Sequence, residues 1–310
     1  FFYCGNIAGS VIGCASAGFI LLRLFDMFTT ACIAAGINVL VFLIALILAR
    51  RSPAPEIQDK PAPYPAAESR YSPLIYVVIA LSGFSALGAE VVWTRLLSLL
   101  LGGTVYTFSI ILAIFLAGLG IGSSIGSYLV RGSSNPRSAL AGCQFALTAG
   151  IAWAAFMISQ SLPYWPINPG MYANDWSPWH MFQLDILRTA WVVLPSTLLW
   201  GASFPLAIAS VADPGRDPGR IVGALYASNT LGAIAGSLGF SLWIIPQFGS
   251  QFAERLTLLA AASAAILALT ASMFRRQLDG ENSAFAHKRS FSRIIYTGIA
   301  LILVALMVDA

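Results

Sequence analysis

The sequence predicts an all-α, polytopic transmembrane helix bundle, and three observations lead to this fold class. The 310 residues are 58% hydrophobic and only 10% charged, whereas roughly 25% of the residues in an average soluble domain are charged. The mean hydropathy is +0.78. The apolar residues also gather in runs of about 20 or more, which is the length of helix that crosses a bilayer. This composition excludes a soluble enzyme, a disulfide-rich secreted module, a disordered chain and a nucleic-acid-binding protein.

About nine apolar runs are predicted to span the membrane. They cover residues 4–25, 28–49, 74–92, 104–130, 138–160, 188–211, 221–245, 255–274 and 293–309. Each run is continuously apolar, whereas a barrel strand would alternate between apolar and polar residues, so the spans are expected to be helices.

The distribution of basic residues predicts the orientation. With the segment 50–72 in the cytoplasm, only Arg23, Arg95, Arg188 and Arg255 lie outside, which leaves 13 of the 17 basic residues inside. This follows the positive-inside rule for a multi-pass protein of a bacterial inner (cytoplasmic) membrane. The lipid bilayer therefore accounts for the pI near 9.0 without a nucleic-acid partner.

An internal repeat predicts the domain organisation. Residues 3–26 align without gaps on 226–249, and the alignment pairs Tyr3 with Tyr226, Asn6 with Asn229, Gly9 with Gly232 and Gly13 with Gly236. The second copy is the fifth span of a six-helix group, so four helices are expected to precede the first copy in a longer polypeptide. Both copies run from inside to outside, as the halves of major-facilitator transporters do.

The predicted domains follow from this repeat. Residues 1–51 are the last two helices of a first, incomplete half, and 52–72 form a cytoplasmic Pro-rich linker. Residues 73–276 form a six-helix second half, and 277–310 add a cytoplasmic loop and a further transmembrane helix.

Three stretches resemble the membrane region of the fused major-facilitator/spermidine-synthase-like proteins of bacteria. They are SGFSALGAEVVWTRLLSLLLGGTVYTFSIILAIFLAGLGIGSSIGS at 82–127, LPSTLLWGASFPLAIA at 194–209 and VGALYASNTLGAIAGSLGFSLWIIPQFG at 222–249. With the first repeat copy, the resemblance covers most of residues 1–276. It implies that a cytoplasmic aminopropyltransferase-like domain often accompanies such a membrane part. Arg23 departs from the pattern, because the second copy has Pro246 at that position.

These residues contain no motif for aminopropyl transfer, so no catalytic residue and no cofactor is predicted. The glycine-rich stretch at 118–122 lies in an apolar run without a preceding strand. Gly118, Gly122 and Gly126 instead line one helix face and indicate close helix packing. Gly232 and Gly236 have the same spacing. The four cysteines lie in apolar spans without a CxxC motif, and His180 and His287 are both in loops, so no metal site is predicted.

Charged residues within spans are costly and are therefore candidate binding residues. Glu90 lies about 25 Å along its helix from Pro73, close to the outer boundary. Glu90 and Arg95 are interpreted either as members of an interhelical or interfacial ion pair or, for Glu90, as a cation or amine site. Asn6 and Asn229 either link helices by amide hydrogen bonds or contact a central substrate.

Two further features are singled out. Pro195 and Pro205 interrupt the hydrogen bonds of one span and predict either a gating helix or a static kink. The outer segment 161–187 contains Trp165, Trp176 and Trp179 together with several other aromatic residues and prolines. It is predicted to lie on the outer membrane face as an aromatic belt, with a ligand lid or a partner-docking loop as the alternative.

Three classes of function stay open. The first is a transporter-like protein for a small solute such as an amine or polyamine. The second is a non-catalytic scaffold that binds other subunits of a membrane complex. The third is the membrane anchor of an aminopropyltransferase-like domain that these residues do not contain.

Overall fold

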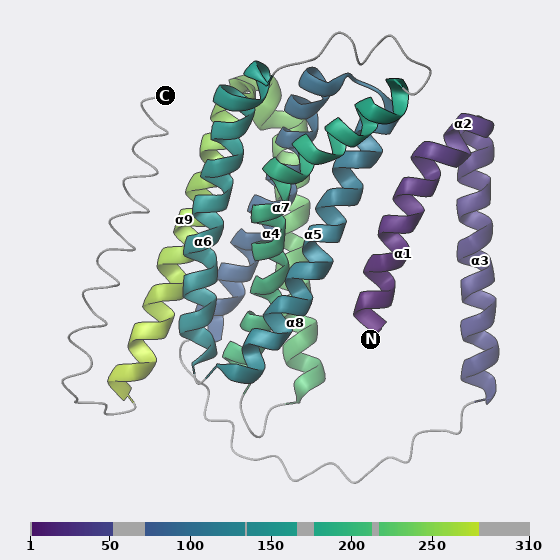
Figure 1. The fold of residues 1–310 in the computed structure, drawn as a ribbon. Helices are drawn as coiled ribbons and strands as arrows, with labels where there is room; N and C mark the ends of the chain where they lie inside the picture. Colours follow the sequence, from purple (N-terminus) through teal and green to yellow (C-terminus); the bar gives the residue numbers. More distant parts are fainter. Residues whose placement is uncertain (1, 52–71, 134, 166–176, 213–216, 279–310) are drawn as a thin grey trace.

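A computed structural model describes residues 2–51, 72–133, 135–165, 177–212 and 217–278 (Figure 1). These residues are helical apart from short turns, and no strand occurs among them. Seven of the helices are long and apolar enough to cross a membrane. The predicted all-α class is therefore confirmed, and the length and composition of these helices are compatible with the predicted membrane spans. The predicted span 293–309 and the predicted linker, apart from Ser72, lie outside the described residues.

The helices follow one another in three groups. The first contains α1 (Phe2–Ser16), the π-helical turn η1 (Ala17–Leu21), α2 (Leu22–Leu24) and α3 (Met27–Arg51). The second contains α4 (Ser72–Leu101), α5 (Val105–Gly132), α6 (Pro136–Phe156), the π-helical turn η2 (Met157–Ser161) and the 3-10 turn η3 (Leu162–Tyr164). The third contains α7 (Ser177–Val211), α8 (Pro218–Gly239), the π-helical turn η5 (Phe240–Ile244) and α9 (Ile245–Leu278).

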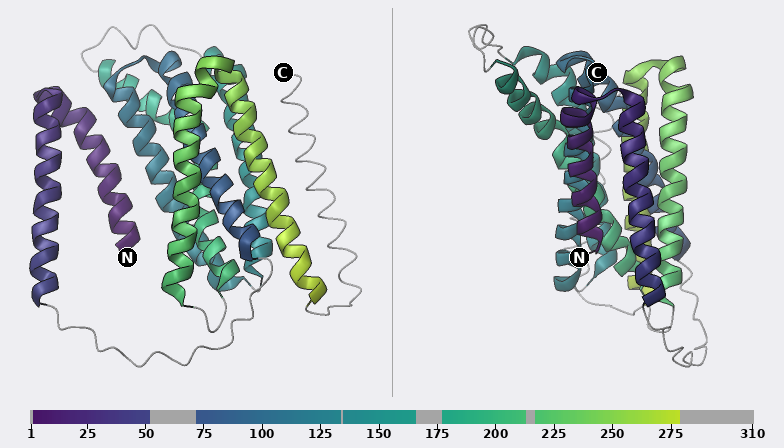
Figure 2. Two further views of the ribbon diagram at one scale, coloured as in Figure 1. Left: turned by 180° about the vertical axis from the view of Figure 1, so that it is seen from behind. Right: turned by 90° about the vertical axis from the view of Figure 1, so that its right-hand side faces the viewer.

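Local chemistry sets the boundaries of these helices. The Thr104 hydroxyl accepts a hydrogen bond from the Thr107 N–H at 3.2 Å and caps α5. Gly102 and Gly249 have φ values of 103° and 82°, a conformation that side chains disfavour. The chain turns at both glycines, and Gly249 divides the apolar run Pro218–Met273 into two antiparallel arms (Figure 2). We call the end of the bundle at which these two turns lie the Gly102 end and the opposite end the Arg131 end.

Helices α4 to α9 form a bundle with a symmetrical set of contacts. Helix α5 packs along α7, and α8 packs along α4 in the equivalent way. Likewise α6 packs against α7, α9 packs against α4, and α6 and α9 contact each other. The contacts of α4, α5 and α6 therefore correspond to those of α7, α8 and α9. Helix α4, the first of one set, and helix α7, the first of the other, run in opposite directions along the bundle (Figure 1).

Small residues bring the backbones together in the two closest helix pairs. A Cβ atom added at Gly232 or Gly236 of α8 would overlap the carbonyl oxygen of Ala80 or Phe84 in α4. In the other pair, Cβ atoms at Gly118, Gly122 and Gly126 of α5 would overlap atoms of Thr197, Leu198 and Ala202 in α7. The predicted packing role of these five glycines therefore agrees with where the structure places them.

Helices α1 and α3 lie beside this bundle (Figures 1 and 2). Helix α1 contacts α5. In the turn η1 that follows α1, Phe19 packs in an aromatic cluster with Tyr106 and Phe182, with ring centroids 5.2–5.4 Å apart. No residue of α3 is buried against the rest of the described chain. This helix is therefore the most exposed apolar element of the described structure.

Candidate functional site

Hydroxyl groups and an indole form a polar centre between α4 and α7. The Trp200 indole donates to the Ser85 hydroxyl at 3.2 Å, and the Ser82 and Ser203 hydroxyls lie 3.5 Å apart. Ser85 also donates to the Ser82 carbonyl at 3.0 Å. All four side chains are buried. This centre links the two helices in the middle of the bundle by neutral hydrogen bonds.

A buried amide lies on the inward face of α6. Gln144 is 0% exposed, and it shares its helix face with the buried residues Leu140, Leu147 and Ile151. Neither the nitrogen nor the oxygen of its amide has a hydrogen-bond partner among the described residues. Such a group costs roughly 1–3 kcal/mol when it stays unpaired, so this position is suited to a water molecule or a polar ligand atom.

Two carboxyl groups lie on the adjoining helices α4 and α9. Glu90 and Glu254 each follow an alanine, Ala89 and Ala253, that belongs to the same buried cluster. Both residues are half-buried. The Oε1 atom of Glu254 is buried and has no hydrogen-bond partner in the described part of the chain. Glu254 lies about 7 Å along α9 from Gly249, so both carboxyl groups are in the half of the bundle nearer the Gly102 end.

Neither carboxyl is neutralised by a basic residue that the structure describes. The ion pair considered for Glu90 and Arg95 does not form between these two side chains, and Arg95 is exposed. The ion pair seen in the described helices joins Asp185 and Arg188 of α7 at 3.9 Å, and both residues are buried. Among the described residues, Glu90 and Glu254 are therefore carboxyl groups without a paired cation.

The two predicted asparagines are placed differently. Asn229 is half-buried in α8 and faces α4, where a Cβ at Gly83 would lie 2.8 Å from its Oδ1. This position fits a contact between helices. Asn6 lies in α1, but its side chain is outside the described part of the structure.

The two prolines lie inside α7, which continues through both of them. Because Pro195 has no N–H, the carbonyl of Trp191 loses its helical donor. The Trp153 indole of α6 donates to this carbonyl at 3.2 Å. The predicted loss of a helical hydrogen bond is thus compensated by a neighbouring helix at Pro195.

The predicted outer aromatic segment is partly helical. Helix α7 begins at Ser177 and includes Trp179, which is exposed. Trp165 packs against the buried cluster and donates from its indole to the Ser161 hydroxyl at 3.0 Å. Trp176 lies outside the described residues.

No group of three or more His, Cys, Asp or Glu residues that could hold a metal ion occurs within the described ranges. Comparison of the chain with protein-family models, curated proteins and solved structures finds no match.

Two residues of this site were not singled out in the sequence. Glu254 lies one residue before the predicted span 255–274, and a span beginning at Gln251 would have included it. Gln144 lies within a predicted span, and its spacing from Leu140, Leu147 and Ile151 is the signal that places an amide on the buried face.

Proposed function

We propose that this chain is a transporter-like membrane protein whose α4–α9 bundle binds a small organic cation of the amine class at Glu90 and Glu254. The observation that carries the proposal is the buried Oε1 atom of Glu254, which has no hydrogen-bond partner among the described residues. A carboxylate in a membrane bundle is costly unless a cation or hydrogen-bond donors accompany it. A protonated amine supplies both the charge and the donors.

Neutral polar groups elsewhere in the bundle also favour a polar solute. Gln144 and the Ser82–Ser85–Trp200–Ser203 polar centre provide neutral hydrogen-bonding groups in the same bundle. Neutral donors and acceptors suit the polar parts of a solute, whereas the two carboxyl groups suit its charge.

We also propose that the chain belongs to a protein with two related halves of six helices each, as its resemblance to the membrane region of spermidine-synthase-like fusion proteins implies. This proposal is supported by π-helical turns at aligned positions in both repeat copies. Residues 17–21 form η1, and residues 240–244 form η5, with the offset of 223 residues that also aligns Gly9 with Gly232. Transporters commonly contain such internal repeats, and π-helical turns often mark functional positions.

The proposed location is the inner membrane of a bacterium with the linker 50–72 in the cytoplasm. The described helices place Arg50, Arg51, Arg131 and Arg220 at the Arg131 end (Figure 1). This clustering supports a cytoplasmic Arg131 end.

Thermal unfolding of the purified chain with putrescine tests the proposal. At a putrescine concentration about 100 times the Kd, binding adds roughly 2.7 kcal/mol to stability, which raises the Tm by about 5–10 °C. Sodium chloride at equal ionic strength should not reproduce the shift. Glu254→Gln and Glu90→Gln should each remove most of it.

Asp217→Asn is the matched control, because Asp217 is an exposed carboxylate that caps α8 outside the carboxyl pair. This variant should keep the full putrescine shift. A shift that survives in both glutamate variants would contradict binding at these residues. The absence of any shift with putrescine or spermidine in the unaltered chain would contradict the amine class.

A scaffold role is the second candidate, and the exposed helix α3 favours it. Its side chains Leu40, Phe42 and Leu48 are 57%, 63% and 60% exposed. If this helix contacts another membrane subunit, a partner should co-purify from native membranes in a fixed ratio. The Ala substitutions Leu40→Ala and Phe42→Ala should then release that partner, whereas they should leave a putrescine shift unchanged.

A further inference from the structure

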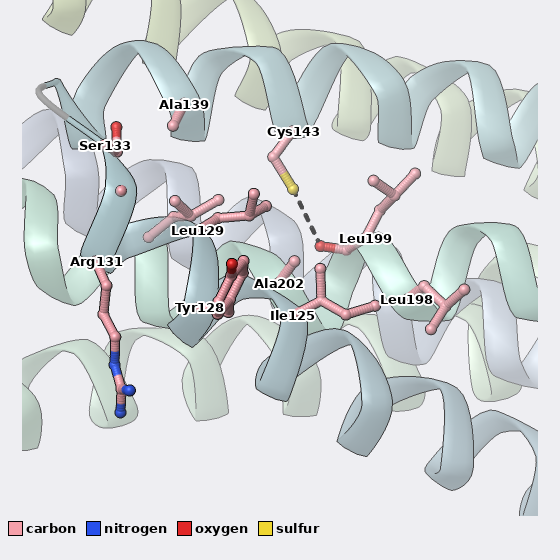
Figure 3. A pocket seen from close by; sticks show the side chains of 12 residues that line it. Ile125, Tyr128, Leu129, Arg131, Ser133, Ala139, Cys143, Leu198, Leu199 and Ala202 are labelled. Carbon is pink, nitrogen blue, oxygen red and sulfur yellow. Dashed lines mark hydrogen bonds between the residues drawn. The ribbon is translucent and has the colours of Figure 1, made fainter.

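A pocket of about 780 Å³ opens between α5, α6 and α7 near the Arg131 end (Figure 3). Its floor is formed by Leu199, Ala202 and Leu206 of α7, and Cys143 of α6 lies beside them. The Cys143 thiol donates to the Leu199 carbonyl at 3.3 Å, so it is held against this floor. The pocket is therefore an apolar groove with a floor built on a packed helix pair.

The groove exists because consecutive helices diverge. Helices α5 and α6 each pack along α7 but have few contacts with each other. The small side chains Ala139 and Ala202 and the close approach of Gly126 to α7 leave the space between them open. At the related α8–α4 contact, the Phe240 ring fills the space over Gly88. The two halves of the bundle thus differ at this point.

The mouth of the groove faces away from the bundle. Ile125, Tyr128 and Leu129 of α5 line it and are 46%, 76% and 49% exposed. In a bilayer these side chains contact hydrocarbon, and Tyr128 suits the interface between the hydrocarbon and the headgroups.

One charged side chain borders the groove. Arg131 is exposed and lies at the edge, extending away from Cys143 (Figure 3). None of the described residues that line the groove is acidic. An arginine at this depth can keep its guanidinium at the level of the lipid phosphates while its stem covers apolar surface.

We propose that this groove binds an anionic phospholipid from the surrounding bilayer, with an acyl chain on the α7 floor and the phosphate near Arg131. The volume lies within the range of sites that hold one small ligand. The floor from Leu199 to Leu206 extends about 10 Å along the membrane-spanning direction, which matches a chain that enters from the headgroup level. The positive edge selects the anionic headgroup.

Native mass spectrometry of the full chain with bound lipids tests this proposal. Phosphatidylglycerol and phosphatidylcholine with identical acyl chains are offered in equal amounts. The unaltered chain should retain phosphatidylglycerol about fivefold more than phosphatidylcholine, the size of effect that one arginine near a membrane surface gives. Arg131→Gln should make the two lipids equal, and Ala139→Phe should lower the retention of both.

Arg220→Gln is the matched control, because Arg220 is exposed at the same end of the bundle but does not line the groove. It should keep the preference for phosphatidylglycerol. Equal retention of both lipids by the unaltered chain, or equal losses in the Arg131 and Arg220 variants, would overturn the proposal. Displacement of phosphatidylglycerol by glycerol phosphate alone would also overturn it, since the acyl chain would then contribute nothing. The mass spectra and the Tm without added lipid show whether Arg131→Gln remains folded.

Discussion

Helices α1 and α8 have the same glycine spacing but use it differently. In α8, Gly232 and Gly236 lie directly against the α4 backbone. At the aligned positions in α1, Gly9 and Gly13, no atom of the described chain lies within 4 Å of an added Cβ. A small-residue pattern therefore shows that a helix can approach another closely, but the contribution to stability depends on whether a second helix occupies that face.

The contact of α1 with the bundle involves other residues. The Gly18 backbone lies against the Ser109 side chain of α5, and Ile7 packs over Gly120. The Cys14 thiol donates to the Ser109 carbonyl at 3.6 Å. Thus α1 contacts its neighbour through one face while its glycine face is open in the described structure.

The largest expected effect compares the same substitution in the two copies. Gly232→Leu would force α8 away from Ala80 and should destabilise the bundle by about 3 kcal/mol, which lowers the Tm by roughly 5–10 °C. Gly9→Leu should leave the Tm unchanged or slightly higher, because leucine favours the helix and meets open space. Thermal unfolding of both purified variants measures the difference, and an equal loss in both would contradict it.

A smaller effect is expected where α1 does contact the bundle. Gly18→Leu should push α1 off α5 at a cost of roughly 1–2 kcal/mol, without unfolding α4–α9. In a chain that carries Ser109→Cys, oxidation should cross-link position 109 to Cys14, and adding Gly18→Leu should lower the yield several-fold. Cys14→Ser provides the background. An unchanged yield with Gly18→Leu would show that this contact does not hold α1 in place.

The smallest effect concerns the turn that follows each copy. Asp26 aligns with Gly249, so the first copy has an aspartate where the second has its turn glycine. The Asp26 carboxylate accepts hydrogen bonds from the Thr29 hydroxyl and the Phe28 N–H, and it thereby caps the start of α3. The hydrogen bond from the Thr29 side chain holds the pKa of Asp26 below its ordinary value of 3.8. The cap therefore stabilises the folded chain fully above pH 3.8, and this stabilisation is lost as the pH falls through the lowered pKa of Asp26.

Hydrogen exchange of residues 27–31 measures this cap. At pH 7, Asp26→Asn should exchange faster than the unaltered chain, because the charged cap at the start of α3 is weakened. At pH 2 the two chains should exchange alike. A difference of equal size at both pH values would show that the ionised carboxylate is not responsible.

Composition and apolar runs predicted the helical membrane class because both depend on the solvent around the chain. They did not predict where α7 begins, since Ser177–Leu187 is helical but less apolar than a span, and hydropathy detects membrane burial rather than helix length. The glycine spacing indicated close packing, but it could not distinguish α8 from α1. The sequence of one helix does not show whether another helix will pack against its glycine face.

The candidate site was only partly predictable for a similar reason. Glu90 was identified because a carboxylate within an apolar run is conspicuous. Glu254 lies where one span ends and a turn begins, so its burial depends on the packing of α9 against α4. Gln144 depends likewise on which face of α6 points inward. Such residues are found only after the helices are placed.

The hydrogen bond from the Trp153 indole to the Trp191 carbonyl has a consequence for biogenesis. Helix α6 is synthesised before α7, so its indole is already in the membrane when the proline-interrupted helix enters. The carbonyl exposed by Pro195 then gains a donor on arrival and need not stay unpaired in lipid. The order of the two helices along the chain thus lets a segment with two prolines insert after the helix that compensates for one of them.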